Sequence, residues 1–122
     1  MRLRITLLLT MSALVGAWAP AAQARDCADV GTRYIAAKHV RTSGPLSCAS
    51  ARRLLVRYFQ RVVNSAQTEG GCAQTRFERR GCPVADYRCH AHYSSRTKRL
   101  TGWCGDGERI VRFDEFDRGP GY

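Results

Sequence analysis

The sequence contains none of the short motifs that are typical of common catalytic and nucleotide-binding sites. It has no glycine-rich phosphate loop, no dinucleotide-binding fingerprint, no glycine-framed nucleophile and no run of metal ligands. These absences argue against nucleotide-dependent enzymes and against the common serine hydrolases. The sequence therefore constrains the kind of protein and its compartment more closely than its chemistry.

Lysine and acidic residues are scarce relative to arginine. Lys38 and Lys98 are the only lysines, and lysine plus arginine number 20 against 10 acidic residues, which gives a net charge of +10. This excess would attract an anionic partner such as nucleic acid, lipid headgroups, an acidic polymer or an acidic protein. The competing interpretation is that the charge only keeps the protein soluble and that the arginines reflect a GC-rich genome.

Long apolar runs are absent except at the N-terminus. Arg2 and Arg4 precede an apolar run from Ile5 to Trp18, and Ala22-Gln23-Ala24 provides the small residues of a cleavage site. This order predicts a signal peptide over residues 1–24, cleaved after Ala24, and hence a secreted protein. An uncleaved membrane anchor is the alternative. No later run is long enough to span a bilayer, so we predict no transmembrane segment in the mature chain.

All six cysteines follow the predicted leader. In an oxidising compartment they predict up to three disulfides, which supplement the modest core of a small domain. Six cysteines allow about 15 pairings, and proximity in the sequence favours only one of these, between Cys72 and Cys82. The disulfide candidates are Cys27, Cys48, Cys72, Cys82, Cys89 and Cys104.

Apolar periodicity predicts one amphipathic helix from Cys48 to Asn64. Ser47 is placed to cap its first turn, and neither glycine nor proline interrupts the run. Apolar residues recur at three- and four-residue steps, as expected for one buried stripe. The stripe consists of Cys48, Ala51, Leu55, Tyr58 or Phe59, and Val62.

Strands are predicted before and after this helix. Thr32 to Val40 forms the first, and Tyr87 to Tyr93 alternates with a period of two that sends Tyr93 inward. Leu100 to Cys104 and Ile110 to Phe113 complete a β-meander, joined by a hairpin at Gly105-Asp106-Gly107. The predicted fold class is therefore α+β, with one helix packed on a small antiparallel sheet and stapled by disulfides.

The domain boundaries follow from composition. One secreted domain is expected over residues 25–118, and residues 119–122 are expected to form a flexible tail. The stretch from Asp114 onward is acidic and rich in glycine and proline, so fraying is expected to begin there.

Five arginines are predicted as binding residues. Three stand at four-residue spacings on the helix with no acidic partner, so they repel one another, as expected for an anion-binding face. The alternative, which is the commoner origin of such a charge run, is a merely solvated helix face. Two lie in the loop between Cys72 and Cys82, where exposed side chains are free to make contacts. They are Arg53, Arg57 and Arg61 on the helix, and Arg79 and Arg80 in the loop.

Three cysteine-centred motifs carry a resemblance to known proteins. They are Ser47-Cys48-Ala49-Ser50-Ala51-Arg52, Tyr87-Arg88-Cys89, and Cys104-Gly105-Asp106-Gly107 ahead of Val111-Arg112-Phe113. With these motifs the segment from Tyr34 to Phe113 resembles a loose class of small exported actinobacterial proteins. The resemblance implies the fold and the export and implies no activity. The loop between Cys72 and Cys82 departs from the simplest form of the pattern.

His90 and His92 are the candidate metal ligands. Two residues apart on a strand, they share a face and are able to hold zinc or copper together with an acidic residue of a neighbouring strand. No third ligand is identifiable from the sequence. We therefore predict no metal site and no cofactor.

Two other classes of function stay open. A small basic nuclease needs a carboxylate base, a histidine acid and arginines that neutralise the phosphate. The candidates are Glu108 or Glu78 as base, His90 or His92 as acid, and Arg88, Arg109 and Arg112 at the phosphate. A cationic membrane-active defence protein would use the arginine-bearing helix, whose apolar face is however expected to lie in the core.

The sequence as a whole favours a non-catalytic binding module for an anionic surface or partner. Nucleic acid stays possible as that partner, although no motif supports it, and nothing in the sequence indicates the oligomeric state.

Overall fold

The computed structural model of this protein describes residue 16 and residues 24–118. The predicted leader therefore lies almost wholly outside the described residues. The elements are β1 (Arg25–Asp26), β2 (Val30–Gly31), β3 (Ile35–Ser43), α1 (Cys48–Asn64), α2 (Cys72–Thr75), β4 (Cys82–Val84), β5 (Tyr87–Ser94), β6 (Arg99–Gly105) and β7 (Ile110–Asp117).

All seven strands join one antiparallel sheet in the order β1-β3-β7-β6-β5-β4, with β2 paired to β3. The predicted meander is confirmed as β5, β6 and β7. The strand from the N-terminal part of the chain, β3, pairs with β7, so Ile35 lies opposite Asp117 and Ser43 opposite Ile110. Sheet predominates in this fold, which is compatible with the α+β class.

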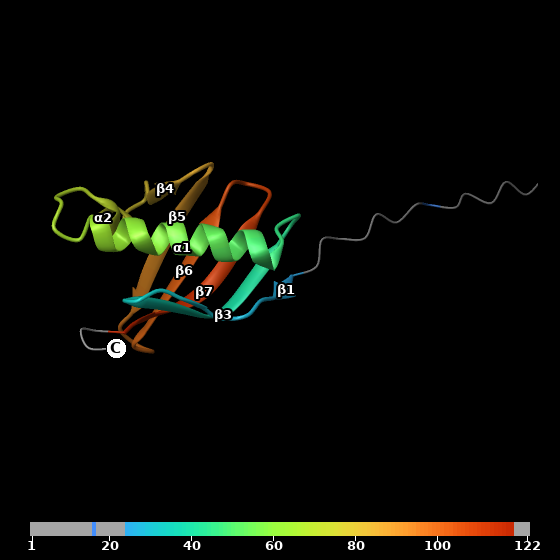
Figure 1. The fold of residues 1–122 in the computed structure, drawn as a ribbon, viewed down its shortest axis with the longest axis horizontal. Helices are drawn as coiled ribbons and strands as arrows, with labels where there is room; N and C mark the ends of the chain where they lie inside the picture. Colours follow the sequence, from blue (N-terminus) through green and yellow to red (C-terminus); the bar gives the residue numbers. More distant parts are fainter. Residues whose placement is uncertain (1–15, 17–23, 119–122) are drawn as a thin grey trace, which may run out of the picture.

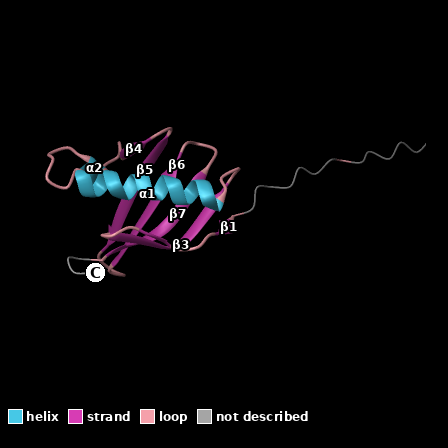
Figure 2. Cartoon of the chain, in the orientation of Figure 1, coloured by secondary structure: helices cyan, strands magenta, loops and turns pink. Residues whose placement is uncertain are grey.

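Helix α1 begins and ends where its sequence predicts. The Ser47 side chain accepts a hydrogen bond from the Ser50 backbone N–H at 3.1 Å, which is the predicted cap. Figure 1 shows α1 running across the strands of the sheet, and Figure 2 shows the same arrangement with the helix in cyan and the strands in magenta. Its buried residues are Ala51, Leu54, Leu55, Tyr58, Phe59 and Val62. The predicted stripe is thus confirmed from Ala51 onward with Leu54 added, whereas Cys48 at its start is only half-buried.

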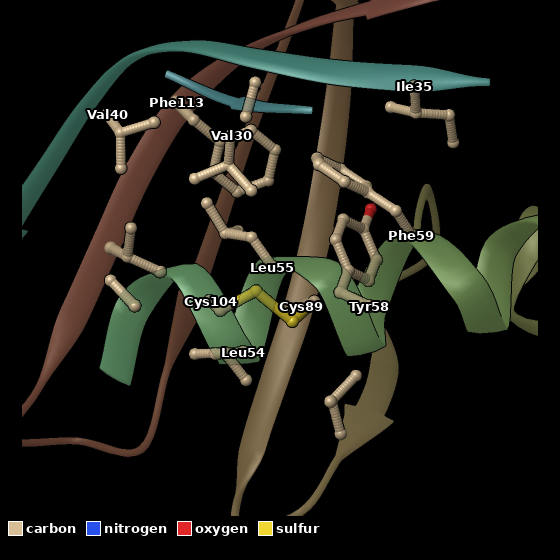
Figure 3. Packing of buried hydrophobic residues seen from close by; sticks show 14 of the residues in the cluster. Val30, Ile35, Val40, Leu54, Leu55, Tyr58, Phe59, Cys89, Cys104 and Phe113 are labelled. Carbon is tan, nitrogen blue, oxygen red and sulfur yellow. A yellow bond between two sulfur atoms is a disulfide. The ribbon is translucent and has the colours of Figure 1, made fainter. Parts of the chain in front are cut away.

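The core lies where these helix residues meet the sheet (Figure 3). The Phe59 ring is 5.3 Å from that of Tyr58 and 5.7 Å from that of Phe113, between centroids, and it meets Phe113 edge to face. Such aromatic pairs add to the free energy gained from burial alone. Cys89 and Cys104 belong to the same cluster and are fully buried.

Three disulfides link the six cysteines. They join Cys27 to Cys48, Cys72 to Cys82, and Cys89 to Cys104. The predicted pairing of Cys72 with Cys82 is thus confirmed. Three such bonds are typical of an extracellular or other oxidising compartment. Within the described residues, no helix has the length and the apolar character needed to cross a membrane.

Three predictions about the elements are wrong: their number, the extent of the last strand and the direction of one side chain. The loop after α1 contains a second helix, α2, which at four residues is too short to show helical periodicity in the sequence. The stretch from Asp114 does not fray at once, because β7 continues to Asp117 through its pairing with β3. Tyr93, predicted to point inward, is 52% exposed, and it pairs with Leu100 next to the turn between β5 and β6.

A buried ion pair joins the loop after α1 to β7. Arg76 Nη1 donates to Glu115 Oε1 at 2.6 Å, and the Glu115 side chain is almost fully buried. Burial raises the pKa of Glu115 from its ordinary value, and the charge of Arg76 opposes that change. Burial also raises the pKa of the adjacent Tyr58 phenol. The pair fixes the position of the loop on the sheet, at the cost of removing two charges from water.

Candidate functional site

A surface hollow of about 220 Å³ lies between α1, the β4–β5 turn and the β6–β7 turn. We call it the arginine groove. It is defined by Ser50, Arg53, Leu54, Arg57, Tyr87 and Arg109, and further apolar wall is contributed by Pro45, Leu46 and Ala85.

Helix α1 places two of the groove's cations. Arg53 and Arg57 lie four residues apart and so project from one side of the helix, while Leu54 between them is buried and anchors this part of the helix to the core. Arg53 Nη2 donates to Ser50 Oγ at 3.1 Å. Because Ser50 also bonds to Ser47 at the helix cap, the start of the helix and the first groove cation are held together.

The third cation, Arg109, is braced by the β6–β7 turn. Asp106 accepts hydrogen bonds from the Arg109 backbone N–H and from its Nε, both at 2.8 Å. These bonds, first the backbone and then the side-chain one, lower the pKa of Asp106 to about 2. The Arg109 guanidinium also lies 5.1 Å from the centroid of the Tyr87 ring. The turn itself depends on Gly107, whose φ of +101° disfavours other residues.

The groove has the chemistry of an oxyanion site. Its lining combines three guanidinium groups with the hydroxyl groups of Ser50 and Tyr87, and it contains no carboxylate, imidazole or thiol. A guanidinium presents two parallel N–H donors that match phosphate, sulfate or carboxylate oxygens. Asp106 offsets part of the charge of Arg109, but neither Arg53 nor Arg57 forms an ion pair with an acidic residue that the structure describes. The groove therefore fits binding of an anion better than acid–base chemistry.

Two of the five predicted binding arginines, Arg53 and Arg57, line the groove. Arg61 instead donates from Nη1 to the Pro83 carbonyl and so ties α1 to β4. In the loop, Arg80 Nε lies 2.8 Å from Glu78 Oε2, and Arg79 is exposed. The structure thus brings two of the five together and separates them from the other three.

Sequence reasoning missed Ser50 and Tyr87 as lining residues and considered Arg109 only as a phosphate ligand of a nuclease. The only local signal for Arg109 was its position just after the predicted hairpin turn. Its approach to α1 depends on packing between segments more than 50 residues apart, which no spacing in the sequence reports.

None of the five main hollows found among the described residues is lined by more than one of the residues considered for a nuclease. The His90 ring stacks on Trp103, with centroids 4.3 Å apart, and His92 lies on the same face of β5. Glu78 is engaged by Arg80, and Glu108 lies in the β6–β7 turn. Across residues 24–118, no group of three or more histidine, cysteine or acidic side chains is placed to hold a metal ion.

The chain matches no protein-family model, no curated protein and no solved structure. Inference about its function therefore starts from the geometry of its surfaces.

Proposed function

We propose that this protein is an exported, non-catalytic binding module that holds an anionic group of a surface, polymer or acidic partner in the arginine groove. One observation carries the proposal: Arg53, Arg57 and Arg109 line a single hollow that has no lining carboxylate. Arg53 is held by its bond to Ser50 and Arg109 by its bonds to Asp106, so these two side chains lose less freedom on binding than unrestrained arginines would.

Electrostatics supplies the mechanism. The net charge is +10 for the whole chain and +8 after cleavage, because the predicted leader carries Arg2 and Arg4 and no acidic residue. This charge attracts an anion from a distance, and the groove then offers paired N–H donors at short range. Because mobile ions screen exposed charges beyond about 8 Å at physiological ionic strength, binding should weaken as salt is added. A membrane-active role is less well supported, since the apolar side chains that an inserting helix needs are buried in the core.

Export is supported by the start of the sheet. Strand β1 begins at Arg25, directly after the predicted cleavage point, and pairs Arg25 with Thr42. Cleavage after Ala24 would therefore leave the sheet whole. We expect protein released by an exporting host to have the mass of a chain that begins at Arg25. Recovery of only the full-length chain in the membrane fraction would contradict a cleaved leader.

The Arg53→Ala/Arg57→Ala double variant is expected to bind inorganic polyphosphate about 30-fold more weakly than the wild type. Each exposed, charge-assisted contact is worth about 1 kcal/mol after allowance for screening. The measurement is isothermal calorimetry in low salt, repeated over a salt series. The slope of log affinity against log salt should also become shallower in the variant, because fewer charges take part.

A matched control separates the groove from net charge. Arg52→Ala/Arg96→Ala removes the same charge from exposed positions outside the groove lining. This control should lose no more than about threefold in affinity, because Arg52 and Arg96 are exposed, do not line the groove and act on the anion only through screened charge. Equal losses in the two double variants would show that only net charge matters and would overturn the groove as the binding site.

A further inference from the structure

A second face of the sheet carries a row of four side chains across four strands. Register pairs His90 of β5 with Trp103 of β6, Trp103 with Arg112 of β7, and Arg112 with Arg41 of β3. Successive side chains of a strand point to opposite faces. The residues that precede or follow these four, namely Cys89, Cys104, Val111 and Thr42, are buried. The row therefore projects from the face opposite the core.

Trp103 is held in place on this face without being buried. Its ring stacks on His90 with centroids 4.3 Å apart and planes 22° apart, and the residue is 40% exposed. His90 in turn lies against Gly81, where an added Cβ would stand 2.6 Å from His90 Cε1. His90, which itself packs against Gly81, thus supports the indole from one side. A large aromatic ring that is both fixed and half-exposed is suited to stacking on a flat ligand.

Beside Trp103 lies a hollow of about 320 Å³ whose lining includes two arginines. The hollow is lined by His39, Arg41, Thr101, Trp103, Arg112 and Asp114, together with Gly102 and Phe113. The one lining carboxylate, Asp114, is engaged by His39, whose Nδ1 is 2.8 Å from Asp114 Oδ2. Arg41 pairs with the exposed Asp26, and Arg112 forms no ion pair with any residue that the structure describes.

The strand spacing places charge close to the ring. Neighbouring strands lie about 4.8 Å apart. Arg112 stands on β7 opposite Trp103 of β6, so the two side chains are close enough to contact the phosphate and the base of one nucleotide. The β-bulge between Lys38 and Arg41, where His39 adopts a φ of +52°, brings His39 to the same hollow.

We propose that this face binds a short stretch of single-stranded nucleic acid, with a base stacked on Trp103 and the neighbouring phosphate between Arg41 and Arg112. Single strands offer unstacked bases to aromatic side chains, and arginines beside the aromatic ring follow the backbone. A sulfated or phosphorylated polymer without bases would contact the arginines but would not stack on Trp103. The site shares no residue with the arginine groove, so this proposal and the proposed function can be tested separately.

The test is fluorescence anisotropy with a labelled single-stranded deoxythymidine oligomer, in low salt. Trp103→Ala should weaken binding about tenfold, as expected for the loss of one stacked base, and Arg112→Ala should weaken it by a similar factor. Trp103→Phe, which keeps a ring, should recover most of the affinity. A duplex of the same length should bind at least tenfold more weakly than the single strand.

Two comparisons complete the design. Tyr93→Ala removes an aromatic residue of similar exposure outside this hollow and should leave the affinity unchanged. Arg53→Ala/Arg57→Ala should weaken the binding of polyphosphate while changing that of the oligomer by less than about threefold. The proposal is overturned if Trp103→Ala binds the oligomer as the wild type does, if Arg112→Ala does so, or if single strand and duplex bind equally well. Oligomer binding that only the groove variant abolishes would also overturn it.

Discussion

Phe59→Ala is expected to lower the free energy of unfolding by about 3–5 kcal/mol, the usual range for a fully buried phenylalanine. Phe59 has no exposed surface, and its ring contacts those of Tyr58 and Phe113 at the centre of the cluster between α1 and the sheet. Truncation therefore removes apolar contacts from both layers and leaves a cavity. A domain of this size has only about 5–15 kcal/mol of stability, so the variant should be close to unfolding at 37 °C.

Urea denaturation followed by circular dichroism measures this loss. Phe116→Ala is the matched control, because Phe116 is 43% exposed and lies outside the core cluster. Its loss should stay below about 1 kcal/mol. A cost below 1 kcal/mol for Phe59→Ala would show that α1 does not pack on the sheet as described.

The second large loss of stability is expected on removal of the buried disulfide that joins β5 to β6. Replacing Cys89 and Cys104 by alanine should cost about 3 kcal/mol, because their bond closes a loop with a sequence separation of 15 and restricts the unfolded chain. The two cysteines are also cross-strand partners on β5 and β6 and are fully buried, so the missing sulfur atoms add a cavity cost.

The Cys27–Cys48 bond is the natural comparison. Its sequence separation of 21 gives a similar effect on the unfolded chain, but both cysteines are partly exposed, so no core cavity should follow its removal. We expect the Cys89→Ala/Cys104→Ala variant to be at least as destabilised as the Cys27→Ala/Cys48→Ala variant in urea. If removing the buried pair left the free energy of unfolding nearly unchanged, the stability of the sheet would depend on other contacts.

The elements that the sequence predicts well are those with long, regular patterns. The helix was placed correctly because Ser47 caps it and because apolar residues repeat at helical spacing over its whole length. The meander followed from strict alternation around Cys89 and from the glycine-rich hairpin at Gly105–Gly107.

The elements that were missed have no such pattern. Strands β1, β2 and β4 contain two or three residues each, which is too few for alternation to show. The extension of β7 was obscured by its acidic residues, because Glu115 is buried through its ion pair with Arg76 rather than through apolar character. An acidic residue in a sequence gives no indication of a partner 39 positions away.

The candidate site was predictable only in part. Arg53 and Arg57 were found from their four-residue spacing, since that spacing fixes a common side of one helix. Arg109 and Tyr87 join them only through tertiary packing, and the row that contains Trp103 and Arg112 depends on the register of the sheet. A shift of register by one residue would send that row into the core, so no local pattern predicts it.

The repulsion between Arg53 and Arg57 bears on the function. Like charges four residues apart destabilise a helix by a few tenths of a kcal/mol, and in the described residues no acidic side chain relieves the cost here. A bound anion would remove it. This gain on binding supports the proposed anion site in the arginine groove.

The most direct test of the groove is an NMR titration of the arginine Nε–H signals with inorganic tripolyphosphate. The account predicts that the largest shifts occur at Arg53, Arg57 and Arg109, at concentrations where Arg79, Arg80 and Arg96 move little. Shifts spread evenly over the surface arginines, or largest in the loop between Cys72 and Cys82, would contradict the arginine groove as the anion site.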